Sequence, residues 1–242
     1  MKRTYWILCL IAVGIVLFAL RHRLAAATGA ITQKAGPRRT IAERLTEHGP
    51  AARARWSPHF AKAQTTYPPK ALVLVGLKAE NRLEIYAGTA DATLKFIRDY
   101  PIRAASGGPG PKLKEGDGQV PEGLYQIESL NPNSRFHLSL RVNYPNRFDR
   151  DQAARDGRTK LGGDIMIHGN AVSIGCLAMG DEAAEDLFVL AADTGLANLS
   201  VILAPLDFRG GKRVPASITL PAWSETLYKN IRAELGRLPK RP

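Results

Sequence analysis

The stretch that decides the fold of this chain reads Asp164-Ile-Met-Ile-His-Gly-Asn-Ala-Val-Ser-Ile-Gly-Cys-Leu-Ala-Met-Gly-Asp181. Its short apolar run, residues 165–167, is typical of a strand and delivers His168 to the strand end. A loop of small residues follows, and Gly175-Cys176 then presents a thiol beside backbone N–H groups. The pattern predicts a strand, a loop and then a second strand or a helix.

This unit contains the parts of a cysteine nucleophile. Such a nucleophile needs a base within hydrogen-bond reach and donors for the developing oxyanion. His168 is the candidate base for Cys176, and the N–H groups of Gly175 and Cys176 are the candidate donors. No Asp or Glu lies between residues 165 and 180, so a backbone carbonyl, with Gly169 as the economical candidate, is expected to orient the imidazole. The spacing alone leaves open a buried, inert Cys beside a strand-end His.

A metal or cofactor site is not expected from the sequence. His168 and Cys176 give two ligands, whereas zinc takes three or four from the protein. The histidines at 22, 48 and 59 show no ligand spacing. The Gly-rich segment 106–122 lacks the Gly-Lys-Ser/Thr ending of a phosphate-binding loop.

Composition places the chain among globular proteins with a basic surface. Of its 242 residues, 45% are hydrophobic and 23% are charged, with a net charge of +12. The excess favours anionic surroundings, such as acidic lipid, an acidic polymer or nucleic acid. No helix-turn-helix, zinc-finger or aromatic-plus-basic strand pattern supports a nucleic-acid partner.

The N-terminus has the sequence pattern of an export signal or a membrane anchor. Residues 5–20 are uncharged and mostly apolar, with Lys2 and Arg3 before them and Arg21 and Arg23 after them. This run is slightly short for a spanning helix and slightly long for the apolar core of a cleaved signal. A buried core helix is a poor fit at this position. We expect an exported protein that is either anchored in the membrane through residues 5–20 or released by cleavage near residues 25–27.

The remaining pattern predicts a mainly β domain with peripheral helices, of a sandwich or barrel type. Strands are expected at 72–75, 82–86, 124–127, 136–141 and 200–203, with a polar loop at 143–163. Helices are expected from 181 to about 193, from about 224 to 235, and in two pieces at 40–48 and 51–56. The domains are predicted as a signal or anchor at 1–27, a linker or helical region at 28–69, a catalytic domain at 70–205 and a helical extension at 206–242.

His168-Gly169 followed by Ser173-Ile-Gly-Cys176 resembles the signature of the L,D-transpeptidase catalytic domain (YkuD-like) family. The segment 116–127 is similar to the Thr-Pro-x-Gly-x-Phe/Tyr segment of that family. Tyr144-Pro-Asn146, Asp149 and Gly157-Arg-Thr159 resemble its YafK-like branch. One position departs from many members, because Ile174 stands where they carry a second His.

The resemblance implies a cysteine enzyme of cell wall remodelling that is periplasmic, either anchored in the inner membrane or secreted by a cleaved signal. Its substrates would be peptidoglycan stem peptides, attacked by Cys176 at an L-centre diaminopimelate carbonyl to form a thioester. Transfer to an amine would make it a transferase, and water would make it a hydrolase whose target includes a wall-linked lipoprotein. The candidate site list is therefore Cys176 and His168 for catalysis; Gly175, Gly169 and Ser173 for the oxyanion and orientation; and Tyr144, Asn146, Arg158 and His137 for the cleft. A membrane-tethered, inactive wall-binding module is the alternative.

Overall fold

The computed structural model describes residues 37–89 and 93–241, and Arg39 begins one compact unit. Its elements follow in this order: α2 (Ile41–Lys62), β1 (Ala71–Leu77), β2 (Arg82–Gly88), β3 (Lys95–Pro101), β4 (Ala104–Ala105), β5 (Gly123–Ser134), β6 (His137–Val142), α3 (Arg147–Arg155), β7 (Met166–His168), β8 (Leu177–Ala178), α4 (Asp181–Thr194), β9 (Leu199–Ala204) and α5 (Ser224–Arg237). Short 3-10 turns occupy Leu196–Asn198 and Phe208–Gly210.

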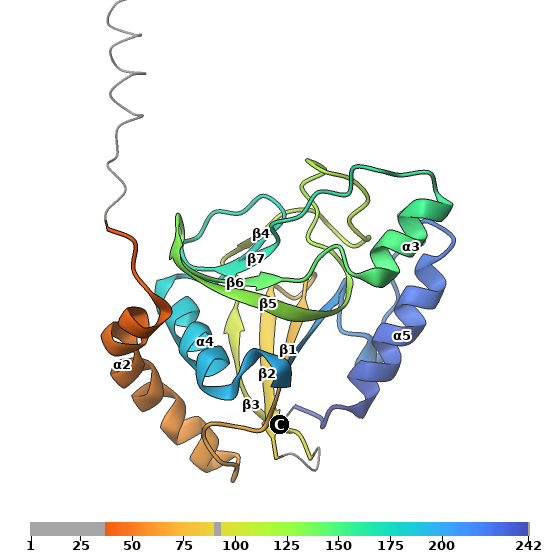
Figure 1. Ribbon diagram of the computed structural model, residues 1–242. Helices are drawn as coiled ribbons and strands as arrows, with labels where there is room; N and C mark the ends of the chain where they lie inside the picture. Colours follow the sequence, from red (N-terminus) through yellow and green to blue (C-terminus); the bar gives the residue numbers. More distant parts are fainter. Residues whose placement is uncertain (1–36, 90–92, 242) are drawn as a thin grey trace, which may run out of the picture. The chain divides into compact units, whose positions relative to one another are not determined.

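The strands of the described residues join into one mixed sheet in the order β3-β2-β1-β9-β5-β6-β7-β8-β4. The β1–β9 and β7–β8 pairs are parallel, and the other pairs are antiparallel. β5 pairs with β9 through its first residues and with β6 through its later ones, so it belongs to both halves of the sheet. Figure 1 shows β5, β6 and β7 running across the direction of β1 and β2.

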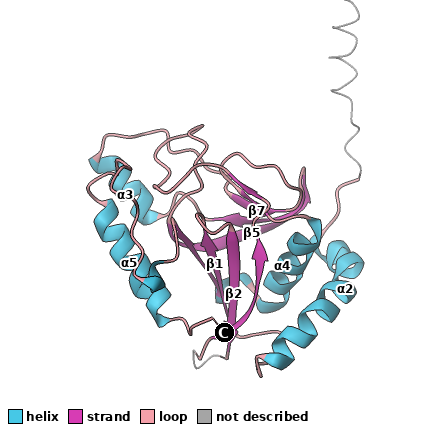
Figure 2. Ribbon diagram, turned by 180° about the vertical axis from the view of Figure 1, so that it is seen from behind, coloured by secondary structure: helices cyan, strands magenta, loops and turns pink. Residues whose placement is uncertain are grey.

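The two halves enclose the main core. Its members come from both halves and from helices α2 and α4, and include Trp56, Leu74, Ile85, Leu140 and Ile167. A second apolar cluster fills the space between α5 and the other face of β1, β2 and β9. Figure 2 shows α2 and α4 together on one side of the strands, and α3 and α5 on the other. This large mixed sheet with surrounding helices is consistent with the predicted mainly β fold.

The structure agrees with the sequence where the patterns are strongest. The hairpin across residues 78–81 is present as the antiparallel β1–β2 pair. The predicted helices near 181–193 and 224–235 are α4 and α5.

Two local predictions were wrong. The segment 143–163, predicted as a loop, contains α3, which begins at a capping box formed by Asn146 and Asp149. The two predicted helical pieces are one helix, α2, which continues through Pro50 and Pro58. The turns on both sides of each proline pack on the core, which outweighs the local cost of the missing hydrogen bonds.

The predicted membrane segment, residues 5–20, lies outside the described residues. Within the described part of the chain, no helix combines the length and the apolar character that crossing a bilayer requires. Anchoring and cleavage therefore stay predictions.

Candidate active site

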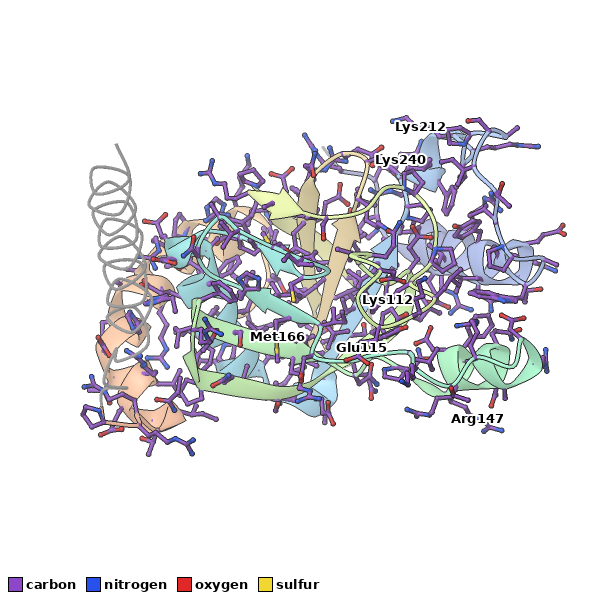
Figure 3. All side chains as sticks on the ribbon, turned by 90° about the horizontal axis from the view of Figure 1, so that it is seen from above. Lys112, Glu115, Arg147, Met166, Lys212 and Lys240 are labelled. Atoms are coloured by element: carbon purple, nitrogen blue, oxygen red, sulfur yellow. The ribbon has the colours of Figure 1, made fainter. Side chains whose placement is uncertain are left out.

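The register of β7 and β8 places the candidate nucleophile beside the candidate base. Ile167 pairs with Leu177 and His168 pairs with Ala178 in this parallel pair, so Cys176 comes level with Met166. Ile167 and Leu177 belong to the core. Because side chains alternate along strands, Met166, His168 and Cys176 share the opposite face. Figure 3 looks onto this region, with Met166 on β7 and Lys112 and Glu115 on the neighbouring loop.

The Cys176 thiol is half-buried and held by backbone groups. The Met166 N–H donates to Cys176 Sγ at 3.4 Å, and the thiol lies 3.5 Å from the carbonyl oxygen of Asp164. No hydrogen bond joins Sγ to the His168 imidazole among the described residues. The two side chains are therefore neighbours on one face and not a preformed hydrogen-bonded pair.

His168 is fixed from two sides. Its side chain is buried, and Nδ1 donates to the Gly169 carbonyl oxygen at 2.6 Å, which is the contact expected from the sequence. Since a carbonyl oxygen only accepts, this contact places the proton on Nδ1 and leaves the lone pair of the neutral ring on Nε2. The Phe136 ring stacks on the imidazole at a centroid distance of 4.7 Å.

Burial keeps both groups uncharged. It raises the pKa of the Cys176 thiol, and the Asp164 carboxylate adds to this, against lowering by the Met166 N–H and by Lys112. Burial also lowers the pKa of His168, more than the hydrogen bond to Gly169 raises it. The resting site is thus a thiol beside a neutral imidazole, which suits a general base that acts when substrate arrives.

The nucleophile turn is held by two serine hydroxyls. Ser173 Oγ accepts the Cys176 N–H at 2.9 Å, and its hydroxyl donates to the Cys176 carbonyl oxygen at 2.6 Å. The Gly175 N–H donates to Ser106 Oγ at 2.6 Å. Ser173 therefore orients the turn, whereas both candidate oxyanion donors are engaged with hydroxyls. Small hydroxyl side chains readily satisfy nearby backbone N–H groups in this way.

Two glycines allow the turn its shape. Gly175 has φ +89°, a region that favours glycine. A Cβ on Gly169 would lie 2.5 Å from Asp181 Oδ1 and 2.8 Å from the Phe136 carbonyl oxygen, so no side chain fits there.

Three of the four predicted cleft residues make contacts within the fold. Tyr144 is buried and its hydroxyl lies 3.4 Å from two loop carbonyls, so it stabilises the interior. Asn146 caps α3 and donates to the Leu124 carbonyl oxygen. His137 contacts Glu185 Oε1 at 2.9 Å, away from the thiol face. Their positions beside turns and strand ends look alike in sequence, and only the fold separates capping and packing from cleft lining.

Arg158 does line a groove. The groove has a volume of about 560 Å³ and lies between the loop that contains Gln119 and the segment 218–221. Arg158 lies above the Trp223 ring and donates to the Leu113 carbonyl oxygen. The groove adjoins the nucleophile turn, because a Cβ on Gly175 would lie 3.3 Å from the Gln119 carbonyl oxygen.

Several residues of the site were not predicted. Phe136, Ser106 and Asp164 contact the base, the turn and the thiol respectively. Asp181 Oδ1 accepts the Asn170 N–H at 2.7 Å and closes the loop between β7 and β8. Only the position of Asp181 at a helix start and of Ser106 at the head of a Gly-rich loop marked them in the sequence.

Ile174 is an exposed apolar residue beside the nucleophile. Its exposed fraction is 85%, and that of Val172 is 55%. Ile174 therefore does not pack into the core, and the rim next to Cys176 is apolar there.

Comparison with known proteins agrees with this geometry. The model of the L,D-transpeptidase catalytic domain family, YkuD, matches residues 70–201. The chain is 34% identical over 113 residues to the Putative L,D-transpeptidase YafK of Escherichia coli K12, a match that covers 46% of this chain and 43% of that protein. It thus spans less than half the length of this curated relative.

Solved structures show weaker likeness. The helical cell shape determining protein Pgp2 of Campylobacter jejuni is 23% identical with a TM-score of 0.46, over 57% of this chain and 49% of that one. Bd1075 of Bdellovibrio bacteriovorus is 21% identical with a TM-score of 0.42, over 71% of this chain and 56% of that one. With the family model matching residues 70–201 and the YafK relative at 34% identity, this chain belongs to the L,D-transpeptidase catalytic domain family.

Proposed function

We propose that this protein is a cysteine-dependent peptidoglycan-modifying enzyme that acts at L-centre diaminopimelate carbonyls through a thioester. The observation that carries the proposal is that Cys176 and His168 lie on one face of β7–β8, with His168 Nδ1 fixed by the Gly169 carbonyl. Family membership supplies the substrate class, the peptide stems of the cell wall.

In the first half-reaction His168 Nε2 takes the proton of the Cys176 thiol as sulfur attacks the carbonyl carbon. The tetrahedral intermediate collapses to a thioester, and the imidazolium returns the proton to the leaving amine. Oxyanion stabilisation by the Gly175 N–H requires that substrate displace Ser106 Oγ, which now accepts that hydrogen. In the second half-reaction His168 takes a proton from water or from an acceptor amine, which attacks the thioester and restores the thiol.

The apolar rim at Ile174, next to Cys176, favours hydrolysis over transfer to an amine. Ile174 offers no polar group to hold an incoming amine, and its 85% exposure leaves the approach to the thioester open to water. Release of a wall-linked lipoprotein would be one such hydrolysis. Transfer to a second stem peptide stays the competing outcome.

The test is digestion of purified cell wall by the full chain, with the products identified by mass spectrometry. Cys176→Ala should abolish turnover and leave the fold intact, because the exchange is small. His168→Ala should lower the rate by about 10²–10⁴-fold. His59→Ala, a half-buried histidine on α2, is the matched control and should retain activity.

The products decide between the outcomes. Fragments that gain water indicate hydrolysis, and new dimers joined between two diaminopimelates indicate cross-linking. Wild-type turnover by a folded Cys176→Ala variant would end the catalytic proposal. A wild-type digest that contains neither product would favour an inactive wall-binding module.

A further inference from the structure

Three side chains from distant parts of the chain meet outside the thiol face. They are His48 of α2, His137 at the start of β6 and Glu185 of α4. His137 Nε2 lies 2.9 Å and His48 Nδ1 lies 3.2 Å from Glu185 Oε1. All three ligand atoms lie within 4.8 Å of one another, and each residue is partly buried.

Hydrogen bonding accounts for only part of this cluster. His137 Nε2 and Glu185 Oε1 make a hydrogen bond. His48 has a side chain that is only 13% exposed, yet its Nε2 is buried and has no hydrogen-bond partner among the described residues. Its other ring nitrogen, Nδ1, lies 3.2 Å from the carboxylate oxygen that His137 already contacts. Two imidazoles thus crowd one carboxylate oxygen, and only the His137 contact is a hydrogen bond, which is the arrangement expected where a shared ion takes the oxygen and both ring nitrogens as ligands.

We propose that His48, His137 and Glu185 bind a zinc ion. Two imidazoles and one carboxylate are a zinc donor set, and ligands at 2.0–2.1 Å in a tetrahedron lie roughly 3.3 Å apart. The two contacts to Glu185 Oε1 are already close to that spacing. A water molecule would complete the four ligands.

The surrounding charges fit this role. Arg55 contacts Glu185 at the second carboxylate oxygen, Oε2, at 3.3 Å, so Oε1 stays available for the ion. Glu47 Oε2 lies 3.7 Å from His48 Nε2, where it can accept the proton that this nitrogen carries when Nδ1 binds metal. The sequence predicted no metal because positions 48, 137 and 185 have no motif spacing, and only the fold brings them together.

The ion would join α2, α4 and the β5–β6 turn directly behind the catalytic histidine. Phe136, the residue before His137, stacks on His168. The Cβ of His137 lies 3.0 Å from where a Cβ on Gly169 would stand. The zinc site would therefore fix the turn that holds the His168 ring in place, and the ion itself would take no part in the thiol chemistry.

Cobalt(II) in place of zinc gives a direct test, because tetrahedral Co²⁺ has visible absorption bands. The full, metal-free chain should bind one Co²⁺ and then exchange it for Zn²⁺, with loss of the bands. His48→Gln, His137→Gln and Glu185→Gln should each weaken binding by about 10-fold or more. His59→Gln on the same helix, and a chain carrying Cys9→Ser and Cys176→Ala, should bind as well as wild type.

Thermal unfolding of the wild-type chain provides a second measurement that needs no variant. Zinc at about 100 times its Kd should raise Tm by roughly 5–10 °C. The proposal is overturned if wild type shows neither bands nor a Tm rise. It is also overturned if binding survives the three ligand variants and is lost with the cysteines. Wall digestion by the zinc-free chain is a separate readout, so the proposed function can stand when the zinc site fails.

Discussion

At the scale of single residues, the chemistry depends on the protonation of two side chains. The Gly169 carbonyl fixes the proton of His168 on Nδ1, and burial disfavours the imidazolium. Burial equally disfavours the Cys176 thiolate. A low-pKa Cys–His ion pair, as in cysteine enzymes with a thiolate at rest, is therefore not the expected ground state.

This protonation state predicts a distinctive alkylation profile. In a Cys9→Ala chain, where Cys176 is the remaining thiol, the rate with iodoacetamide should rise about tenfold per pH unit from pH 6 to 8, because the thiolate fraction rises that way below the pKa, which burial raises. A short unstructured peptide with one cysteine, whose thiol pKa is about 8.5, measured alongside, should level off at lower pH. A plateau already present below pH 8 would show an ion pair instead.

Because burial keeps His168 neutral, activity should persist to a lower pH than an ordinary histidine base would allow. The base must be neutral, and the pKa of His168 is below its ordinary value. Turnover is therefore retained at pH 6.5 and lost only as the pH falls further and the ring becomes protonated. Measurement of kcat/KM between pH 4.5 and 8 checks the sign, and a loss of activity already above pH 7 would contradict it.

At the scale of elements, helix α2 is part of the fold. Trp56 is fully buried, and its Nε1 donates to the Asp186 carbonyl oxygen at 2.9 Å. Its ring contacts Phe60 and Tyr100 edge-on. A helix that lies before the residues matched by the family model thus supplies a large side chain to the main core.

Removal of the Trp56 side chain should strongly destabilise the domain. Trp56→Ala should lower the free energy of unfolding by about 3–5 kcal/mol, measured by urea denaturation. Ser57→Ala, the exposed neighbour on the same helix, should change it by less than about 0.5 kcal/mol. Equal and small effects from both variants would mean that α2 is not integral to the domain.

The elements also show where sequence reasoning reached its limit. The β1–β2 hairpin and helix α4 followed from apolar alternation and from acidic residues in a first turn, which are local signals. The position of His168 at a strand end was equally local. The stacking of Phe136 on His168 and the Ser106 contact to Gly175 join residues 32 and 69 positions apart, and no local period encodes them. The capping role of Asn146 could not be predicted from its residue type, because a capping side chain and a cleft side chain share that type.

At the scale of the whole molecule, the proposed chemistry and the N-terminal sequence require the same compartment. Peptidoglycan stems lie outside the cytoplasm, and residues 5–20 have the character of an export signal or anchor. The net charge of +12 favours association with anionic surfaces there. Basic residues on both sides of the apolar run weaken the positive-inside signal. The orientation is therefore inferred from the location of the proposed substrate.

We therefore predict that the folded domain faces the periplasm. Alkaline phosphatase fused after Pro242 should be active, because its disulfides form outside the cytoplasm and not within it. The same fusion without residues 1–36 is the control and should be inactive.

A charge in the apolar run, Leu10→Arg, costs about 2.5–3.5 kcal/mol at the centre of a spanning helix and should reduce export. N-terminal sequencing of the exported protein then separates the two modes, since a start near residue 28 means cleavage and a start at the first residues means an anchor. A full-length fusion that is inactive, while the same chain fused to a fluorescent protein accumulates in the cytoplasm, would refute the periplasmic assignment and remove the enzyme from its proposed substrate.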